Sequence, residues 1–310
     1  MVFKLLTYRD QENDLRAGLL VGEDVYDVAR ITSCADHVRV SRILEDWRTL
    51  SSALQSAAEA PPADCAIGPL STLKLGAPLD PVGAIFCAAA NFKDHMFAMA
   101  RKLGQAPEPD PREHDVKPYH FLKPARQALT GPDAVVKLPT YAQKVDWEAE
   151  LVAVIGSAAR NVPVASALDH VAGYAVGNDL SVRDRVYMKR PNVPEASLFK
   201  TDFLGMKGFD QSCPLGPWIV PASAISDPQR LSIKLWLDDD LMQDSNTSNM
   251  VFSVAEQIAY LSERVTLLPG DIVMTGTPAG TGAEQDRFLS PGQTVRAWIE
   301  QIGELRTTLA

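Results

Sequence analysis

Hydrophobic and polar residues alternate weakly over residues 1–30, and this pattern predicts short β-strands. The pattern changes at Val40, where apolar residues begin to recur three or four positions apart, which predicts an amphipathic helix with one buried face. The apolar positions of this helix are Ile43, Leu44, Trp47, Leu50 and Leu54. Proline-proline and glycine-proline pairs at 61–62 and 68–69 then end the pattern, so we expect a small N-terminal α/β subdomain over residues 1–75.

Beyond residue 80, continuous apolar runs that contain β-branched residues predict buried strands. These runs span residues 82–90, 151–155, 171–180 and 272–275, and residues 295–300 alternate as a half-buried strand does. The proline-rich segment 104–118 predicts a long loop of the kind that often covers a binding site. Ser253 and Glu256 have the spacing of a capping box, which predicts the start of a helix. We therefore expect a larger domain over residues 80–310.

The composition predicts a packed protein that does not bind polyanions. The chain has 310 residues, of which 46% are apolar and 22% charged, and its net charge is -9. An acidic chain without a basic run is a poor ligand for nucleic acid or an anionic membrane, so neither partner is expected. No stretch reaches the roughly 20 apolar residues of a membrane span, and residues 1–10 carry no apolar signal core, which predicts a cytoplasmic protein. The four cysteines form no C-x-x-C pair, which predicts reduced thiols rather than a zinc or redox site.

Two closely spaced glutamates carry the strongest chemical signal in the chain. Glu148 and Glu150 are two positions apart, and side chains with this spacing point to the same face of a strand. Neighbouring carboxylates repel each other and are costly to bury unless a cation lies between them. The alternative is a solvated face of an edge strand, but the apolar run 151–155 favours a central strand. Asp179 follows a second predicted strand, so we expect these three carboxylates to hold one divalent ion, Mg²⁺, with Mn²⁺ or Ca²⁺ as alternatives.

An ordered set of motifs over roughly residues 80–305 resembles the fumarylacetoacetate hydrolase family. The motifs are Asn91-Phe92-Lys93-Asp94-His95, Phe121-Leu122-Lys123-Pro124, Glu148-Ala149-Glu150-Leu151, Asn178-Asp179 with Arg183-Asp184, Lys207-Gly208-Phe209-Asp210, Pro214-Leu215-Gly216-Pro217, and Pro269-Gly270-Asp271 with Thr275-Gly276-Thr277-Pro278-Ala279-Gly280. The resemblance implies an α+β fold, a mixed β-sheet roll or sandwich with flanking helices, and a homodimer. It also implies a lid, a segment that covers the site, around residues 91–120.

The resemblance also implies which residues form the site. The matching positions are the metal ligands Glu148, Glu150 and Asp179, the catalytic residues His95 and Lys207, and the substrate-binding residues Lys123, Arg183 and Thr277. In the family's hydrolases, a lid histidine takes a proton from water and the resulting hydroxide attacks a carbonyl. The C–C bond then breaks and leaves a metal-bound enolate, whose charge Lys207 would stabilise or to which it would return a proton.

Three activities fit these residues. The resemblance implies first a divalent-metal-dependent hydrolase that cleaves a C–C bond in an acylpyruvate-like diketo acid. The alternatives are an oxo-acid decarboxylase or tautomerase that uses the same metal and enolate chemistry, and a non-catalytic oxo-acid-binding relative. In each case the expected ligand is a small anionic oxo or diketo acid.

Two positions depart from the family's pattern. Ala98 stands where the hydrolases have a glutamate three residues after the lid histidine, a residue that would orient the imidazole. Glu108 or Glu113, both in the lid, is the expected substitute. Val186 stands where the family has a glutamine. The long lid predicts either a larger, more apolar substrate or a segment that packs on a partner subunit.

Overall fold

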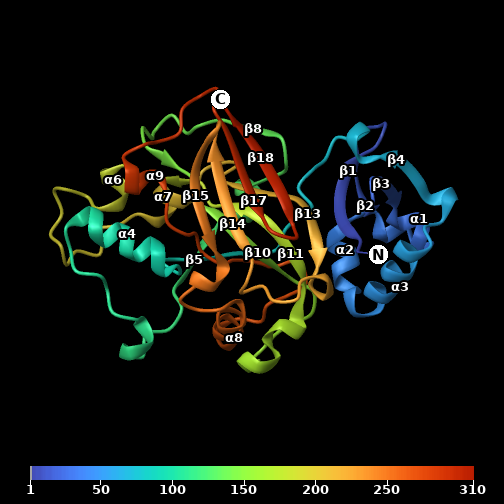
Figure 1. Cartoon of the computed structure of the whole chain (residues 1–310), viewed down its shortest axis with the longest axis horizontal. Coiled ribbons are helices and arrows are strands. Elements are labelled where there is room, and N and C mark those ends of the chain that lie inside the picture. The colour runs from blue at the N-terminus through green and yellow to red at the C-terminus, as the bar shows by residue number, and fades with distance from the viewer. Residues whose placement is uncertain (1) are drawn as a thin grey trace.

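A mixed sheet of 11 strands runs through the part of the chain that the computed structural model describes, residues 2–310 (Figure 1). Its strands are hydrogen-bonded in the order β4-β3-β2-β1-β13-β11-β10-β16-β5-β6, and β7 pairs with β13. Their bounds are β1 Lys4–Arg9, β2 Leu15–Val21, β3 Asp24–Asp27, β4 Ala66–Pro69, β5 Ile85–Ala88, β6 His120–Lys123, β7 Leu129–Thr130, β10 Ala149–Ile155, β11 Val171–Asn178, β13 Cys213–Pro221 and β16 Ile272–Met274.

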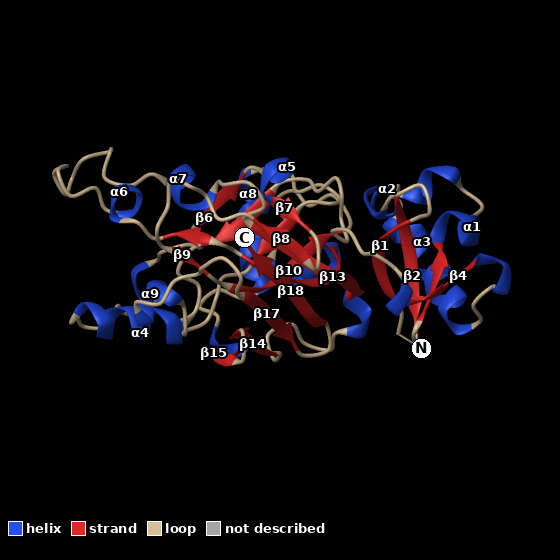
Figure 2. Ribbon diagram, turned by 90° about the horizontal axis from the view of Figure 1, so that it is seen from above, coloured by secondary structure: helices blue, strands red, loops and turns tan. Residues whose placement is uncertain are grey.

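A second sheet of five strands packs against the centre of the first, and the larger hydrophobic core lies between them (Figures 1 and 2). Its order is β15-β14-β17-β18-β8, and the short strands β9 and β12 form a separate pair. The bounds are β8 Ala134–Val136, β9 Val145–Asp146, β12 Ser181–Val182, β14 Ser232–Leu237, β15 Asp240–Asn246, β17 Thr294–Ile299 and β18 Gly303–Leu309. Packed mixed sheets with flanking helices are the α+β fold that the family resemblance implies.

Two groups of helices lie at opposite ends of the molecule, and α5 and α8 lie between them (Figure 2). Their bounds are α1 Val28–Thr32, α2 Val40–Glu45, α3 Trp47–Glu59, α4 Lys93–Leu103, α5 Ala125–Ala128, α6 Arg185–Met188, α7 Phe203–Lys207, α8 Val254–Arg264 and α9 Gly282–Gln285. Helices α1, α2 and α3 cover the N-terminal strands, whereas α4, α6, α7 and α9 lie at the far end of the molecule (Figures 1 and 2). Ser253 caps α8 by accepting from the Glu256 amide, which confirms the predicted capping box.

Strand β10 is central and buried on both faces, as its apolar run predicts. It pairs antiparallel with β11 on one side and with β16 on the other. Its odd-numbered apolar residues from Leu151 to Ile155 face the core between the sheets, and the even-numbered Val152 and Val154 face a second core. Polar groups at the start of this strand are therefore shielded from water and need partners within the protein.

The N-terminal strands extend the large sheet, because β1 pairs with β13 through Leu5 and Ile219. The single helix predicted from Val40 is in fact two helices, α2 and α3, which meet at Asp46. Asp46 leaves the helical conformation (φ -105°, ψ 16°), and its carboxylate lies 3.4 Å from Nε2 of His37.

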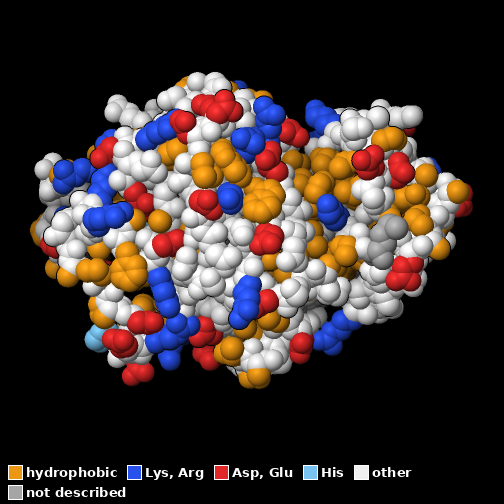
Figure 3. All heavy atoms as spheres, viewed as in Figure 1, with side chains coloured by type: hydrophobic (Ala, Val, Ile, Leu, Met, Phe, Trp, Pro, Cys, Tyr) orange, Lys and Arg blue, Asp and Glu red, His pale blue; other side chains and the backbone are white. Residues whose placement is uncertain are grey.

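The surface carries interspersed charges of both signs on the face that Figure 3 shows, with apolar side chains between them. No helix within residues 2–310 is long and apolar enough to cross a membrane. The four cysteines are free thiols, as predicted, and three of them are buried.

Candidate metal centre and active site

Three buried carboxylates meet where β10 begins and β11 ends. Glu148 lies just before β10, Glu150 lies within it, and Asp179 lies just after β11. The Asp179 amide donates to the Glu148 carbonyl at 2.9 Å, which extends the ladder between the two strands and brings their side chains together. One carboxylate oxygen from each residue lies within 4.8 Å of the other two. The structure thus brings together the three residues that the sequence suggests as metal ligands.

Two lysines neutralise part of this negative charge. Lys207, at the end of α7, donates from Nζ to Glu148 Oε2 at 2.8 Å and to Asp179 Oδ2 at 2.6 Å. Lys123, at the end of β6, donates to Asp179 from the other side. Burial lowers the pKa of Lys207, but the charges of Asp179 and Glu148 outweigh it and raise the pKa above its usual value, so the amine stays protonated.

Glu150 is the carboxylate that these cations stabilise least. Burial raises the pKa of Glu148, but the charges of Lys207 and Arg183 outweigh burial and hold the pKa below its usual value. For Glu150, burial and the charges of Asp179 and Glu148 act in the same direction and raise its pKa well above the usual value. A divalent cation held by the three carboxylates would supply the missing positive charge, and an all-oxygen donor set suits Mg²⁺, Mn²⁺ or Ca²⁺. The residues present therefore fit a bound metal ion.

Arg183 and Thr277 lie at the site but also serve its framework. Arg183, just after β12, donates to Glu148 and, from Nε, to Asp146 Oδ2 at 3.0 Å. The Thr277 hydroxyl donates to the Ala149 carbonyl at 2.9 Å and accepts from Gln243 Nε2 at 2.9 Å. Thr277 thereby holds the start of β10, and both residues also line the cavity described below.

His95 is oriented by a carboxylate from a distant part of the chain. Its Nδ1 lies 2.5 Å from Oε1 of Glu284, and Glu284 Oε2 accepts from the Gly280 amide at 2.6 Å. His95 belongs to α4 and Glu284 to α9, and these helices lie side by side (Figure 2). A carboxylate at Nδ1 favours the tautomer that leaves Nε2 as the basic nitrogen.

The expectation that Glu108 or Glu113 would replace the glutamate missing at position 98 is wrong. Both residues are exposed, and Glu108 lines a hollow on the outer side of α4 beside Lys93. The reason is geometric, because α4 turns His95 toward α9 rather than toward the proline-rich half of the lid. Val186 is 54% exposed, so the glutamine of the family's pattern has no counterpart at the site from this position.

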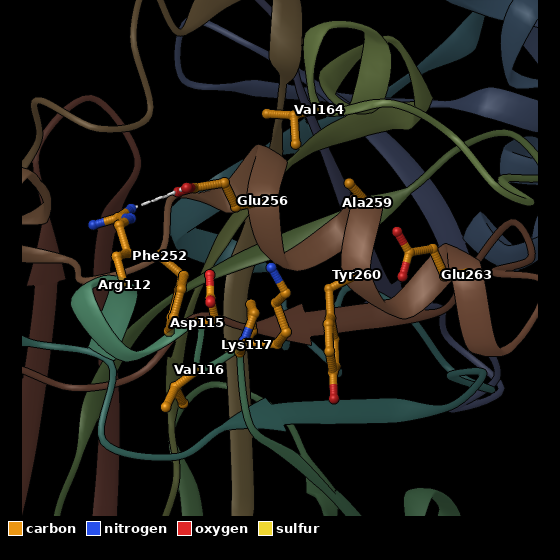
Figure 4. A pocket seen from close by; sticks show the side chains of 11 residues that line it. Arg112, Asp115, Val116, Lys117, Val164, Phe252, Glu256, Ala259, Tyr260 and Glu263 are labelled. Atoms are coloured by element: carbon orange, nitrogen blue, oxygen red, sulfur yellow. Dashed lines mark hydrogen bonds and ion pairs between the residues drawn. The ribbon is translucent and has the colours of Figure 1, made fainter. Parts of the chain in front are cut away.

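A cavity of about 150 Å³ opens beside the carboxylates. Its lining residues are Ala88, Ala89, Ala90, Asn91, His95, Phe121, Glu148, Arg183, Phe203, Met206, Lys207 and Thr277. One wall is therefore charged, and the other is apolar. A larger hollow of about 310 Å³ between the lid and α8 contains none of the predicted site residues (Figure 4).

Three residues at the site are not predicted from the sequence: Asp146, Gln243 and Glu284. Asp146 continues the two-residue spacing of Glu148 and Glu150, and this signal would have indicated it. Glu284 follows four residues after the glycine-rich motif that ends at Gly280, which is a weak signal. Gln243 lies on β15 in a segment without a motif, so only the structure shows that it bonds the Ala149 amide at 3.0 Å.

Known proteins are similar to this chain in both sequence and fold. A sequence model described as fumarylacetoacetate (FAA) hydrolase C-terminal matches residues 84–310. The oxaloacetate tautomerase fahd2, mitochondrial, of Xenopus laevis is 38% identical over 256 residues, which cover 82% of this chain and 74% of that protein. The structure of maleylpyruvate hydrolase from Sphingobium sp. SYK-6, in complex with manganese (II) ion and pyruvate, has a TM-score of 0.74 and 30% identity, and the match covers 99% of this chain and 98% of that one. Fumarylacetoacetate hydrolase from the psychrophilic Exiguobacterium antarcticum gives a TM-score of 0.79 at 25% identity and covers 99% of each chain.

These likenesses extend over the site. The matched range contains the three carboxylates as well as His95 and Glu284, which come from four separate elements or their ends. The similar proteins include a hydrolase and a tautomerase, so this set of relatives carries out more than one reaction. The chain belongs to the fumarylacetoacetate hydrolase family, a family of enzymes.

Proposed function

We propose that this protein is a divalent-metal-dependent hydrolase that cleaves a C–C bond in a small acylpyruvate-like diketo acid. The observation that carries the proposal is the His95–Glu284 pair, because its histidine lines the same cavity as Glu148 of the carboxylate cluster. A hydrolytic cleavage needs an oriented base to activate water, and a histidine held by a carboxylate meets that need. The similarity to maleylpyruvate hydrolase, at 30% identity, supports the same reaction class.

Glu148, Glu150 and Asp179 would hold the metal ion, for which we propose Mg²⁺. Mn²⁺ is an alternative, because the similar maleylpyruvate hydrolase was solved in complex with manganese. When bound, the ion supplies Lewis-acid polarisation of the substrate's oxygens.

His95 would act as the general base. With Nδ1 held by Glu284 at 2.5 Å, Nε2 takes a proton from water, and the hydroxide adds to the carbonyl of the bond that breaks. Glu284 then faces an imidazolium and stabilises its positive charge. The leaving carbon departs as an enolate, which takes a proton to become the oxo-acid product.

Lys207 and Arg183 would serve the anionic substrate. Lys207 is protonated in the folded chain, so it can stabilise the enolate or return the proton to carbon. The cavity of about 150 Å³ is smaller than the roughly 300–1,000 Å³ of pockets for drug-sized ligands, which supports a short substrate. Its apolar wall, formed by Phe121, Phe203 and Met206, suits a carbon tail rather than a second charged group.

Tautomerisation of an oxo acid is the second candidate. The oxaloacetate tautomerase of Xenopus laevis is 38% identical to this chain, and keto–enol exchange also needs a base beside a polarised carbonyl. In that reaction His95 would move a proton between carbon and oxygen, and no water would attack.

Turnover of an acylpyruvate and of oxaloacetate, with and without Mg²⁺, tests both candidates. The variants are His95→Ala and a matched control, His114→Ala, whose side chain is exposed in the same lid. Metal-dependent cleavage of the acylpyruvate that disappears only in His95→Ala supports the hydrolase. Turnover of oxaloacetate alone supports the tautomerase, and binding of both acids without turnover contradicts both candidates.

The homodimer expected from the family is also a proposal. Leu198, Phe199 and Leu204 are 97%, 72% and 69% exposed, and such apolar side chains are suited to a subunit interface. Light scattering on the purified chain measures its mass directly, and a monomer at micromolar concentration would contradict the proposal.

A further inference from the structure

Asp146 is a fully buried carboxylate that does not line the cavity and does not belong to the proposed metal site. It is 0% exposed and ends the short strand β9, beside α9 (Figure 2). Its Oδ1 accepts from the amides of Gly282 at 2.6 Å and Trp147 at 2.8 Å. Its Oδ2 accepts from the Ala283 amide at 3.0 Å and from Arg183 Nε at 3.0 Å. One side chain thus contacts a site cation and the first turn of α9 at the same time.

The contact with α9 leads directly to the proposed base. Glu284 follows Ala283 in α9, and its two oxygens bind His95 Nδ1 at 2.5 Å and the Gly280 amide at 2.6 Å. Because α9 has only four residues, its own hydrogen bonds cannot fix its position, and the contacts of its first turn must do so. Asp146 supplies two of these contacts.

The backbone is shaped to let Asp146 approach. A Cβ atom on Gly282 would lie 2.7 Å from Asp146 Oδ1 and 2.0 Å from the Arg287 carbonyl oxygen, closer than real contacts allow. Glycine at this position therefore permits the short bond between the Gly282 amide and the carboxylate.

The contact with Arg183 leads to the metal ligands. Arg183 donates to Asp146 through Nε and to Glu148 through its terminal nitrogen, so its planar guanidinium group is held between the two carboxylates. The orientation of this cation over the cavity depends on Asp146 as much as on Glu148.

We propose that Asp146 is a positioning residue that sets Arg183 and the His95–Glu284 pair in a fixed relation to each other. Its catalytic consequence rests on the proposed function, because it assumes that His95 is the base. Asp146 acts through two other residues and touches no substrate. A change at Asp146 should therefore alter the state of the His95 ring, which a residue that only stabilises the fold would leave unchanged.

Asp146→Asn keeps the shape of the side chain but replaces one acceptor oxygen with a donor, which must face an amide or Arg183. We expect kcat to fall about 10²-fold, in the range that general base catalysis contributes. The matched control is Asp271→Asn, because Asp271 is also buried and binds two backbone amides, at 2.7 and 2.8 Å, but lies on the turn between α8 and β16. The control should lose stability without losing kcat.

A double-mutant cycle with Glu284→Gln tests whether Asp146 acts through Glu284. If it does, the double variant is about as slow as the slower single variant, because the same orientation is lost only once. If the two losses in kcat multiply in the double variant, the two residues act independently, and the proposal that Asp146 acts through Glu284 is overturned.

Nuclear magnetic resonance of the histidine ring nitrogens gives a readout that needs no turnover. In the wild type, His95 should show a proton on Nδ1, and Asp146→Asn should shift it toward a mixture of tautomers, whereas Asp271→Asn should not. Ala283→Pro offers a milder variant if Asp146→Asn fails to fold, because it removes one amide donor in the first turn of a helix, where proline is tolerated. An unchanged His95 ring in the folded variants would overturn the proposal, whatever substrate the enzyme proves to use.

Discussion

Glu284 accepts a hydrogen bond from His95 although the two residues are 189 positions apart in the chain, and their Oε1 and Nδ1 atoms lie 2.5 Å from each other. Both side chains are largely shielded from water, because 18% of the His95 side chain and 8% of the Glu284 side chain are exposed. A carboxylate in this position fixes the orientation and the tautomer of the imidazole. The geometry therefore supplies, from α9, the group that Ala98 cannot supply from α4.

Glu284→Gln should lower kcat by about 10²-fold, while binding of substrate changes little. The glutamine oxygen can still accept from Nδ1, but it carries no charge to stabilise the imidazolium. Steady-state kinetics on the substrate found active in the wild type measures this split between kcat and KM. Glu113→Gln, an exposed lid residue, should behave as wild type, and an equal loss in this control would contradict the role of Glu284.

Glu150→Gln should weaken binding of Mn²⁺ by at least about 10-fold, in line with the 10–100-fold effects seen even for groups outside the ligand shell. The substitution keeps the size of the side chain and removes the charge that a divalent ion would balance. Isothermal titration calorimetry measures the affinity without any need for turnover. Glu304→Gln, on the exposed face of β18, is the control and should bind as wild type.

Activity gives a second check on the metal site. Glu150→Ala should abolish metal-dependent turnover, because the methyl group offers no ligand oxygen. Full activity of this variant at saturating Mg²⁺ would show that the three carboxylates are not the metal centre.

The cluster of three carboxylates could be predicted from the sequence because its signal is local. Glu148 and Glu150 share a face through the two-residue period of a strand, and the apolar run after them indicates a central strand, which β10 is. The alternation also placed the later strands near their observed bounds. These predictions depend only on neighbouring residues and on the physics of burial.

The parts that could not be predicted depend on distant contacts. Nothing near His95 indicates Glu284, because their contact exists only once α4 and α9 pack together. The order of the large sheet is equally non-local, since β1 pairs with β13 and β5 with β16. Only the family resemblance predicts the fold, and the break at Asp46 has no local signal because the apolar period continues through it.

Arg112→Ala should release the second half of the lid. Arg112 holds Glu256 at the start of α8 through bonds of 2.9 and 3.0 Å, and it also lies 5.1 Å from the centre of the Phe252 ring (Figure 4). The pair is partly exposed, so its loss should cost less than about 1 kcal/mol, or at most about fivefold in kcat/KM. The variant changes Arg112 rather than Glu256, because Glu256 also belongs to the capping box of α8.

Limited proteolysis between residues 104 and 118 provides the direct measurement of this release. The variant should be cleaved faster than wild type at low salt, and about 1 M salt should remove most of the difference by screening the pair. Lys117→Ala, which lines the same hollow, is the control. Equal cleavage rates for wild type and Arg112→Ala at low salt would show that the Arg112–Glu256 pair does not hold the lid on α8.

His120 should make the protein less stable in mild acid. Its ring stacks on Tyr260 at 5.8 Å, its Nε2 lies 3.3 Å from Gln257 Oε1, and burial lowers its pKa from 6.5 to about 4. The unfolded chain therefore binds more protons than the folded chain between these two pH values. The free energy of unfolding should then fall as the pH drops from about 6.5 to about 4, by at most about 3 kcal/mol, and level off below that range.

His120→Gln removes the titrating group and keeps a polar partner for Gln257, so it should flatten this part of the pH dependence. Urea unfolding at pH values from about 4 to about 7 measures the free energy in each variant. His114→Gln is the control, because the side chain is exposed, and it should keep the wild-type slope. An unchanged slope in His120→Gln would show that burial of His120 does not cause the acid sensitivity and would contradict this prediction.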